Sequence, residues 1–245
     1  MNYVRSQPKP ESALESLTIA TLPQVVRLSW GLGETTNRGP KPKQSTERIV
    51  AAAIRLADDD GLEGLSMGSL AKPLGLAATA LYRYVDSKET LVELMVDSAV
   101  GHPPVTASSS GWSENARAWA RSLLDVYARH PWLSDVVVTG MPRTPNNLGW
   151  IESLLVSLAE SPLTESERLS AALLLQGVVR NYAAMIRSIP AGSDANASFI
   201  AVLPVLGAGA YPRLIAELQR ERDSVFDEFG FALDTTIRGL ATRRP

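Results

Sequence analysis

The chain has no cysteine, which excludes disulfides, thiolate nucleophiles and cysteine-based zinc sites. Histidine is nearly as scarce, since only His102 and His130 occur, each directly before a proline. Two isolated histidines lack the paired spacing that zinc ligands require. We therefore predict no metal, no cofactor and no catalytic residue.

Net charge is also small. The 24 basic residues are balanced by 26 acidic ones, and the formal net charge at pH 7 is -2. Nucleic-acid-binding domains are commonly basic, yet the interval 38–101 holds 8 basic and 9 acidic residues. Binding to DNA would therefore depend on local positive charge, which is found at residues 38–48 and 83–88.

Long hydrophobic runs are missing as well. The N-terminus lacks an apolar segment ahead of a small-residue cleavage site, so no signal peptide is expected. The longest apolar run, 199–211, contains Pro204 and is shorter than the roughly 20 residues of a membrane-spanning helix. We expect a cytoplasmic protein with no membrane partner.

Helical periodicity dominates what is present. Apolar residues recur three and four apart, and no alternating apolar segments bounded by turns stand out, so the predicted class is all-α. We expect short helices from Pro131 and over 67–74 and 78–85, and further helices over 46–60, 90–100, 113–129, 147–160, 164–188 and 222–242.

Residues 66–88 carry the most specific pattern. Ser66 can cap the helix that follows by accepting a hydrogen bond from an early amide. Gly75 stands where this helix must end in a left-handed turn. Pro73, in the last turn, lacks an amide hydrogen, so we expect the helix to end early or kink.

A second short helix is expected over residues 78–85. Leu81 and Val85 are four apart and point inward, whereas Thr79, Tyr82 and Arg83 face outward, and Tyr84 is expected to be exposed as well. Two short helices joined by a tight turn form a helix-turn-helix, whose second helix enters the major groove of DNA.

The octapeptide LYRYVDSK at 81–88 resembles the LYRYF-x-SK signature of the TetR/AcrR family of bacterial transcriptional regulators. The similarity covers about 46–101. The remainder resembles the family's variable C-terminal domains loosely, most clearly at 226–231 and 238–240. The resemblance implies an N-terminal three-helix DNA-binding domain and a helical domain for ligand binding and dimerisation. We predict three segments: an extension over 1–44, the helix-turn-helix domain over 45–102 and the regulatory domain over 103–245.

The resemblance also implies roles for individual residues. Tyr84 and Lys88 would hold the DNA backbone, and Tyr82 would contact a phosphate or a thymine methyl. Base edges would face Ala78, Thr79 and Arg83, with Arg83 the candidate for a bidentate guanine contact. An arginine of the tetracycline-repressor branch reaches a base from the position of Gly68, which glycine cannot do.

A basic arm precedes the first helix and contains Arg38, Lys41 and Lys43. Such an arm can reach phosphates or the minor groove, as in homeodomains. A solvated linker explains the same charges equally well.

The regulatory domain holds aromatic and amide side chains at helical positions. Any one of them is more often a core residue than a ligand contact, although amides among apolar residues need partners. No histidine follows His130, so the histidine-held metal–drug complex of the tetracycline branch does not carry over. The candidate pocket residues are Trp119, Tyr127, Trp150, Gln176, Asn181, Tyr182 and Met185.

We therefore expect a homodimeric regulator, with repression the expected activity, that binds a palindromic double-stranded DNA operator and is released by a small apolar effector. The helices beginning near 164 and 222 would form the dimer interface. The alternative is a helical ligand- or protein-binding module with a weakened helix-turn-helix, which Gly68, Pro73 and the low charge favour.

An enzyme is the third choice. Residues 64–68 spell G-x-S-x-G, but the nucleophile elbow of hydrolases needs a strand before its serine. Three aspartates at 58–60 precede this motif instead. The glycines at 207–209 lack the third glycine of a dinucleotide loop.

Overall fold

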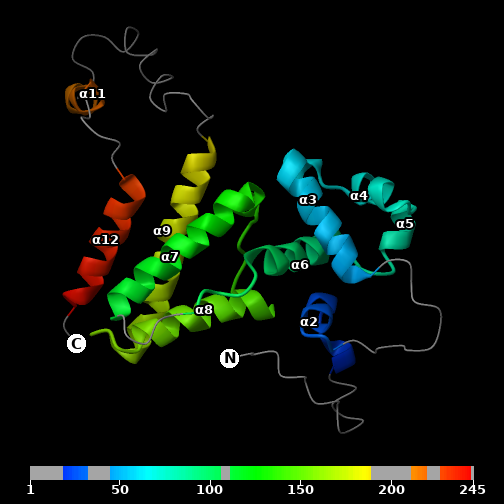
Figure 1. Cartoon of the computed structure of the whole chain (residues 1–245), viewed down its shortest axis with the longest axis horizontal. Coiled ribbons are helices and arrows are strands. Elements are labelled where there is room, and N and C mark those ends of the chain that lie inside the picture. Colours follow the sequence, from blue (N-terminus) through cyan, green and yellow to red (C-terminus); the bar gives the residue numbers. More distant parts are fainter. Residues whose placement is uncertain (1–18, 33–44, 106–110, 189–210, 220–226, 244–245) are drawn as a thin grey trace.

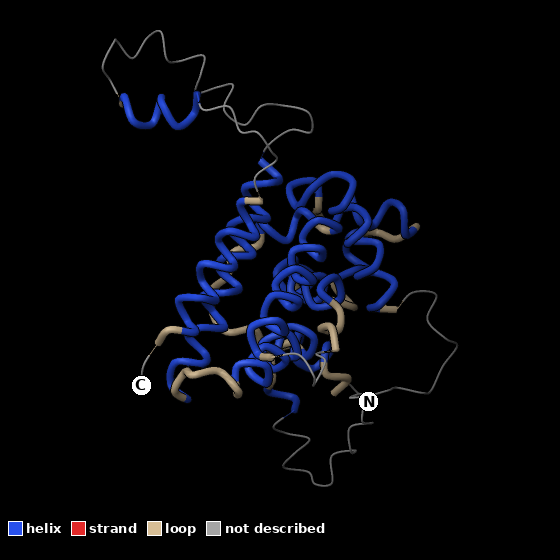
Figure 2. The backbone as a smooth tube through the Cα atoms, turned by 60° about the vertical axis from the view of Figure 1, so that its left-hand side comes forward, coloured by secondary structure: helices blue, strands red, loops and turns tan. Residues whose placement is uncertain are grey.

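The computed structural model describes residues 19–32, 45–105, 111–188, 211–219 and 227–243. Within these ranges every regular element is helical, which confirms the all-α class (Figures 1 and 2). The helices are α2 (Gln24–Ser29), α3 (Thr46–Gly64), α4 (Met67–Leu74), α5 (Ala78–Leu81), α6 (Lys88–Val100), α7 (Trp112–Arg129), the 3-10 helix η1 (Pro131–Asp135), α8 (Pro145–Leu158), α9 (Glu165–Ser188), α11 (Pro212–Gln219) and α12 (Glu228–Ala241).

Helix α6 connects two groups of helices. On one side it packs against α2 and α3; α3 in turn packs against α4, and α4 against α5 (Figure 1). On the other side it contacts α8 and α7, which pack with α9 and α12. Buried side chains form a continuous core from Val25 to Leu240. Helix α6 ends at Gly101 (φ 56°), and the domain boundary after residue 102 stays a prediction.

The caps of the helix-turn-helix follow from local sequence. Ser66 Oγ accepts from the Ser69 amide at 3.0 Å, and Ser69 Oγ accepts from the Ser66 amide at 2.8 Å. This reciprocal pair is a capping box. Gly75 is left-handed, with φ 65°. Ser87 caps α6 through one hydrogen bond, which its Oγ accepts from the Thr90 amide at 3.0 Å. The predicted cap at Ser66 and the predicted bend at Gly75 are confirmed.

Helix α4 does not end early at Pro73. It continues to Leu74, because the proline lies in the last turn and the amides of the next two residues bond carbonyls of that turn. The Gly75 amide bonds the carbonyl of Lys72 at 3.1 Å, and the Leu76 amide bonds that of Ala71 at 3.0 Å. These two bonds form a Schellman closure, which satisfies carbonyls at the helix end.

Helix α5 is shorter than predicted, because it ends at Leu81 and not at Val85. Beyond it the amides of Arg83 and Tyr84 bond carbonyls three residues back, at 3.3 and 2.9 Å, so the chain continues as tight turns. Leu81 and Val85 are both 0% exposed, which confirms their inward direction.

Other boundaries shift by a few residues. Helix α3 was expected to stop near Asp60; it breaks at Gly61 (φ 73°, ψ 171°) and adds a turn up to Gly64. Helix α12 is described from Glu228, after Asp227 caps it through the Gly230 amide at 2.8 Å. Residues 220–226, part of the expected last helix, lie outside the described ranges.

Helix α9 is long and apolar enough to cross a membrane by length and composition, with a mean hydropathy of 1.3. It instead packs against α7, α8 and α12. Ala171, Leu175 and Val179 are buried there. Helix α9 thus packs one face against α7, α8 and α12, while apolar residues of its other face, such as Leu174 and Ile186, are exposed.

Candidate DNA-binding surface and regulatory body

Helix α5 lies at the edge of the molecule (Figure 1), and several predicted contact residues of the helix-turn-helix are exposed. Thr79 and Arg83 are exposed, and Tyr82 is 52% exposed. Lys88, the first residue of α6, is exposed as well. These four side chains are the predicted DNA-contacting residues that the fold leaves accessible.

Tyr84 differs from the expectation. It is half-buried and packs against the hydrophobic core, as does the half-buried Ala78. Tyr84 directly precedes Val85, whose side chain is fully buried. A tyrosine packed in this way can bury its ring and still present its polar hydroxyl to solvent.

The positive charges on this surface are not neutralised internally. Among the described residues, neither Arg83 nor Lys88 forms an ion pair. Lys72, to which the helix-turn-helix pattern assigns no contact, is exposed four residues after Gly68 and so shares its face of α4. Arg38, Lys41 and Lys43 of the basic arm lie outside the described residues.

The candidate pocket residues do not gather at a single site. Trp119 and Trp150 are 2% and 5% exposed and pack edge to face, with ring centroids 5.7 Å apart. Trp119 donates its indole N–H to the Trp150 carbonyl at 2.9 Å, and Trp150 donates to the Gly101 carbonyl at 3.0 Å. Both tryptophans are therefore core residues whose polar atoms are satisfied.

The other candidates are divided between the core and the surface. Tyr182 packs edge to face on Phe229 of α12, with centroids 5.8 Å apart. Asn181 and Met185 are exposed on α9. Tyr127 is half-buried, and burial raises the pKa of its hydroxyl while the charge of Arg180 opposes that rise.

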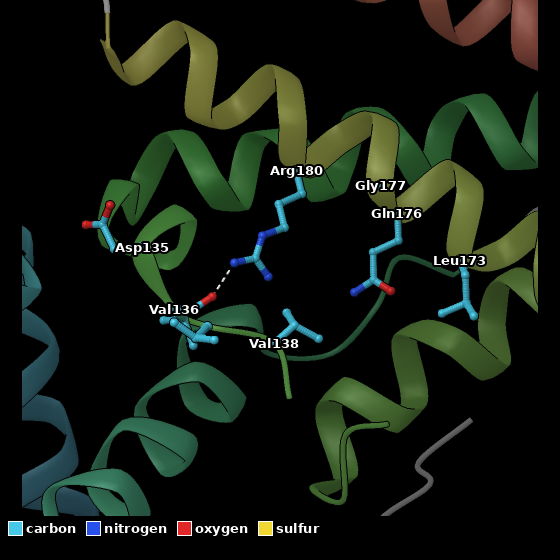
Figure 3. Close-up of a pocket in the computed structure, with 8 residues that line it drawn as sticks. Asp135, Val136, Val138, Leu173, Gln176, Gly177 and Arg180 are labelled. Carbon is cyan, nitrogen blue, oxygen red and sulfur yellow. Dashed lines mark hydrogen bonds between the residues drawn. The ribbon is translucent and has the colours of Figure 1, made fainter. Parts of the chain in front are cut away.

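An open groove lies between residues 136–138 and α9 (Figure 3). Its volume is about 540 Å³. Arg180 donates a hydrogen bond to the Val136 carbonyl across it, and Gln176 is the only candidate pocket residue that lines it. Mixed apolar and polar lining is typical of small-molecule sites. The lining residues are Asp135, Val136, Val137, Val138, Leu173, Gln176, Gly177 and Arg180.

Polar contacts join the two groups of helices. Glu93 of α6 binds the Arg143 guanidinium at 2.9 and 2.6 Å. Asp58 of α3 accepts from Trp132, which lies just ahead of the groove. The sequence contains one signal for the contact between Asp58 and Trp132. The aspartates at 58–60 lie near the C-terminal end of α3, where negative charge opposes the helix dipole. In the described part of the chain, no cluster of three or more histidine and acidic residues is arranged to hold a metal.

Comparison with known proteins agrees with this architecture. The model for bacterial regulatory proteins of the tetR family matches residues 49–95, and that for the tetracyclin repressor-like C-terminal domain matches 104–244. The chain is 34% identical over 229 residues to the HTH-type transcriptional repressor DrrR1 of Streptomyces coeruleorubidus, covering 89% of this chain and 84% of the relative.

Solved structures share the fold. ActR from Streptomyces coelicolor, in its apo form, is 25% identical, with a TM-score of 0.68 over 82% of this chain and 97% of its own. BioQ with its double-stranded DNA operator is 18% identical, with a TM-score of 0.58 over 82% of this chain and 99% of its own, and shows likeness of fold alone. Because the two family models match residues 49–95 and 104–244, the chain belongs to the TetR family and is a DNA-binding transcriptional regulator.

Proposed function

We propose that this protein is a ligand-responsive repressor that binds a palindromic operator as a homodimer. The observation that carries the proposal is the exposed pair Arg83 and Lys88, which has no ion-pair partner among the described residues and flanks the end of a helix-turn-helix. Arg83 would read a guanine edge and Lys88 would bind phosphate. Ala78, Thr79, Tyr82 and Tyr84 would complete the contact, with the basic arm on the adjoining DNA. Such a regulator acts in the cytoplasm.

Helices α9 and α12 are the proposed dimer interface. Leu174 and Met185 of α9 are 50% and 41% exposed, and Phe231 of α12 is 59% exposed. A Cβ added at Gly239 of α12 would meet nothing within 4 Å, so a second helix has room to approach there. Apolar surface gathered on neighbouring helices is typical of a subunit interface. A twofold axis would set two reading helices about 34 Å apart, on successive major grooves.

The proposed effector site is the groove beside α9. Val136, Val137 and Val138 offer an apolar wall, and Arg180 offers a charge that no carboxylate pairs among the described residues. An apolar small molecule with an acidic group would suit both. ActR has been solved in complex with actinorhodin, which supports a small-molecule effector. Release from DNA requires only that the effector prefer the conformer that does not fit the operator.

The alternative, a binding module with a weakened helix-turn-helix, relied partly on Pro73. That residue leaves α4 intact to Leu74, so this support is lost.

The experiment is selection of duplexes from a random library by the full-length protein, followed by affinity measurements between 50 and 200 mM salt. We expect an inverted repeat, two protomers per duplex and an affinity that falls steeply with salt. Failure to enrich any sequence would refute the repressor proposal.

A further inference from the structure

Helix α2 lies before both matched family segments, the first of which begins at residue 49, and it is nevertheless part of the folded body. Val25 is 1% exposed, and Val26 and Leu28 pack against the same core. The helix lies against α6 (Figure 1). Its six residues are too few to form a stable helix alone, so α2 is held by these contacts.

The first residue of α2 binds the DNA-reading part of the molecule. Gln24 Oε1 accepts a hydrogen bond from the Asp86 amide at 2.7 Å. Asp86 belongs to the turn that follows α5, two residues before Lys88 and three after Arg83. Gln24 therefore supports the backbone between the proposed base contact and the proposed phosphate contact.

The other end of α2 reaches the regulatory body. Trp30, directly after the helix, donates its indole N–H to the Arg143 carbonyl at 2.9 Å. Arg143 is itself fixed to Glu93 of α6 by two hydrogen bonds, at 2.9 and 2.6 Å. One short helix thus touches the reading turn at its start and the segment leading into α8 at its end.

We propose that α2 is a strap between the turn that contains Asp86, here called the reading turn, and the group of helices α7, α8, α9 and α12. Gln24 and Trp30 are then positioning residues for operator recognition. In a dimer, each α5 would enter one major groove. The more rigidly each α5 is joined to the dimerising helices α9 and α12, the less the distance between the two can vary. One base pair added between half-sites moves one of them by about 3.4 Å and rotates it by about 34° about the DNA axis. A rigid strap penalises that change, and a loosened one tolerates it.

The DNA test rests on the proposed operator binding. The duplex selected by the wild-type protein is compared with versions carrying one base pair more or less between half-sites. We expect Gln24→Ala to lower the preference for the selected spacing about threefold, because the free energy of one hydrogen bond corresponds to a factor of about that size. The double variant Q24A/W30F should lower it about tenfold. The dependence of affinity on salt should not change, because no phosphate contact is removed. Ser29→Ala, which removes only a bond to Val26 within α2, should retain the wild-type preference.

A purely structural role would lower Tm and leave the spacing preference unchanged, and that result would overturn the proposal. A second measurement does not depend on DNA, and so separates failure of the strap from failure of operator binding. Hydrogen exchange of the Asp86 amide in the full chain should accelerate in Gln24→Ala and also in Trp30→Phe, although Trp30 lies at the far end of α2. Unchanged exchange in Trp30→Phe would refute the strap.

Discussion

Asp58 Oδ1 accepts the indole N–H of Trp132 at 2.7 Å, joining α3 to the 3-10 helix η1. The same oxygen lies 2.8 Å from Nδ1 of His130. Residues 136–138, one wall of the groove, begin directly after η1. A single carboxylate oxygen therefore connects the helix that supports the helix-turn-helix with the segment that leads into the groove.

We expect Trp132→Phe to lower the free energy of unfolding by about 2 kcal/mol, because hydrogen bonds to charged groups contribute roughly that much. Urea unfolding measures it. The matched control is Asp59→Asn, which changes an exposed neighbour and should alter stability by less than about 0.5 kcal/mol. If Trp132→Phe is as mild as the control, the link to Asp58 contributes nothing to stability.

The cap of α4 gives a second prediction. Ser66→Ala removes the acceptor of the Ser69 amide and should cost about 1 kcal/mol of stability. Ser66→Asp retains a capping oxygen and should stay close to the wild type. Chemical denaturation of the three proteins under the same conditions decides the matter, and equal loss in both variants would argue against capping.

Local signals explain what the sequence predicted well. Ser66 and Gly75 act through bonds to residues at most a few positions away, so their roles can be inferred without the fold. The inward direction of Leu81 and Val85 was also correct, because a helix and a tight turn both bring residues four apart to one side. For the same reason the pattern did not show that α5 ends at Leu81.

Non-local contacts explain what was missed. Trp119 and Trp150 bond to one another and to the end of α6, and helical spacing does not reveal which residue an indole N–H meets. Asn181 and Met185 lie on the exposed face of α9, while Gln176 of the same helix lines the groove. Gln24 and Asp86 meet across 62 residues, a contact that only the folded chain defines.

The proposed dimer interface predicts a change of oligomeric state. Leu174→Glu places a charge on the α9 face that is proposed to meet a second protomer, and burying an unpaired charge there is strongly unfavourable. Sedimentation equilibrium should find the wild type dimeric and this variant monomeric at the same concentration.

The control is Val105→Glu, which adds the same charge at a residue that is 96% exposed and lies outside α9 and α12. This variant should remain dimeric. A dimeric Leu174→Glu protein would exclude this face as the interface.

The burial of Tyr127 predicts a loss of stability at alkaline pH. Burial raises the pKa of its hydroxyl, with Arg180 opposing the rise. The unfolded chain ionises tyrosine near pH 10, so above that pH the unfolded state binds fewer protons than the folded state and stability falls. Below pH 10 both states are protonated and the effect vanishes.

Tyr127→Phe should therefore lose less stability than the wild type when Tm is measured between pH 9 and 11. The exposed Tyr82→Phe serves as control and should follow the wild-type curve. Parallel curves for all three proteins would contradict a raised pKa for Tyr127.

The central claim is that Arg83 reads bases and Lys88 holds phosphate. Its most direct test is the affinity of Arg83→Ala and Lys88→Ala for the selected operator and for a scrambled duplex, at one salt concentration. Arg83→Ala should weaken operator binding by about 1–3 kcal/mol with little effect on the scrambled duplex. Lys88→Ala should weaken both alike and reduce the salt slope by about 1. Equal losses on the two duplexes for both variants would contradict this assignment.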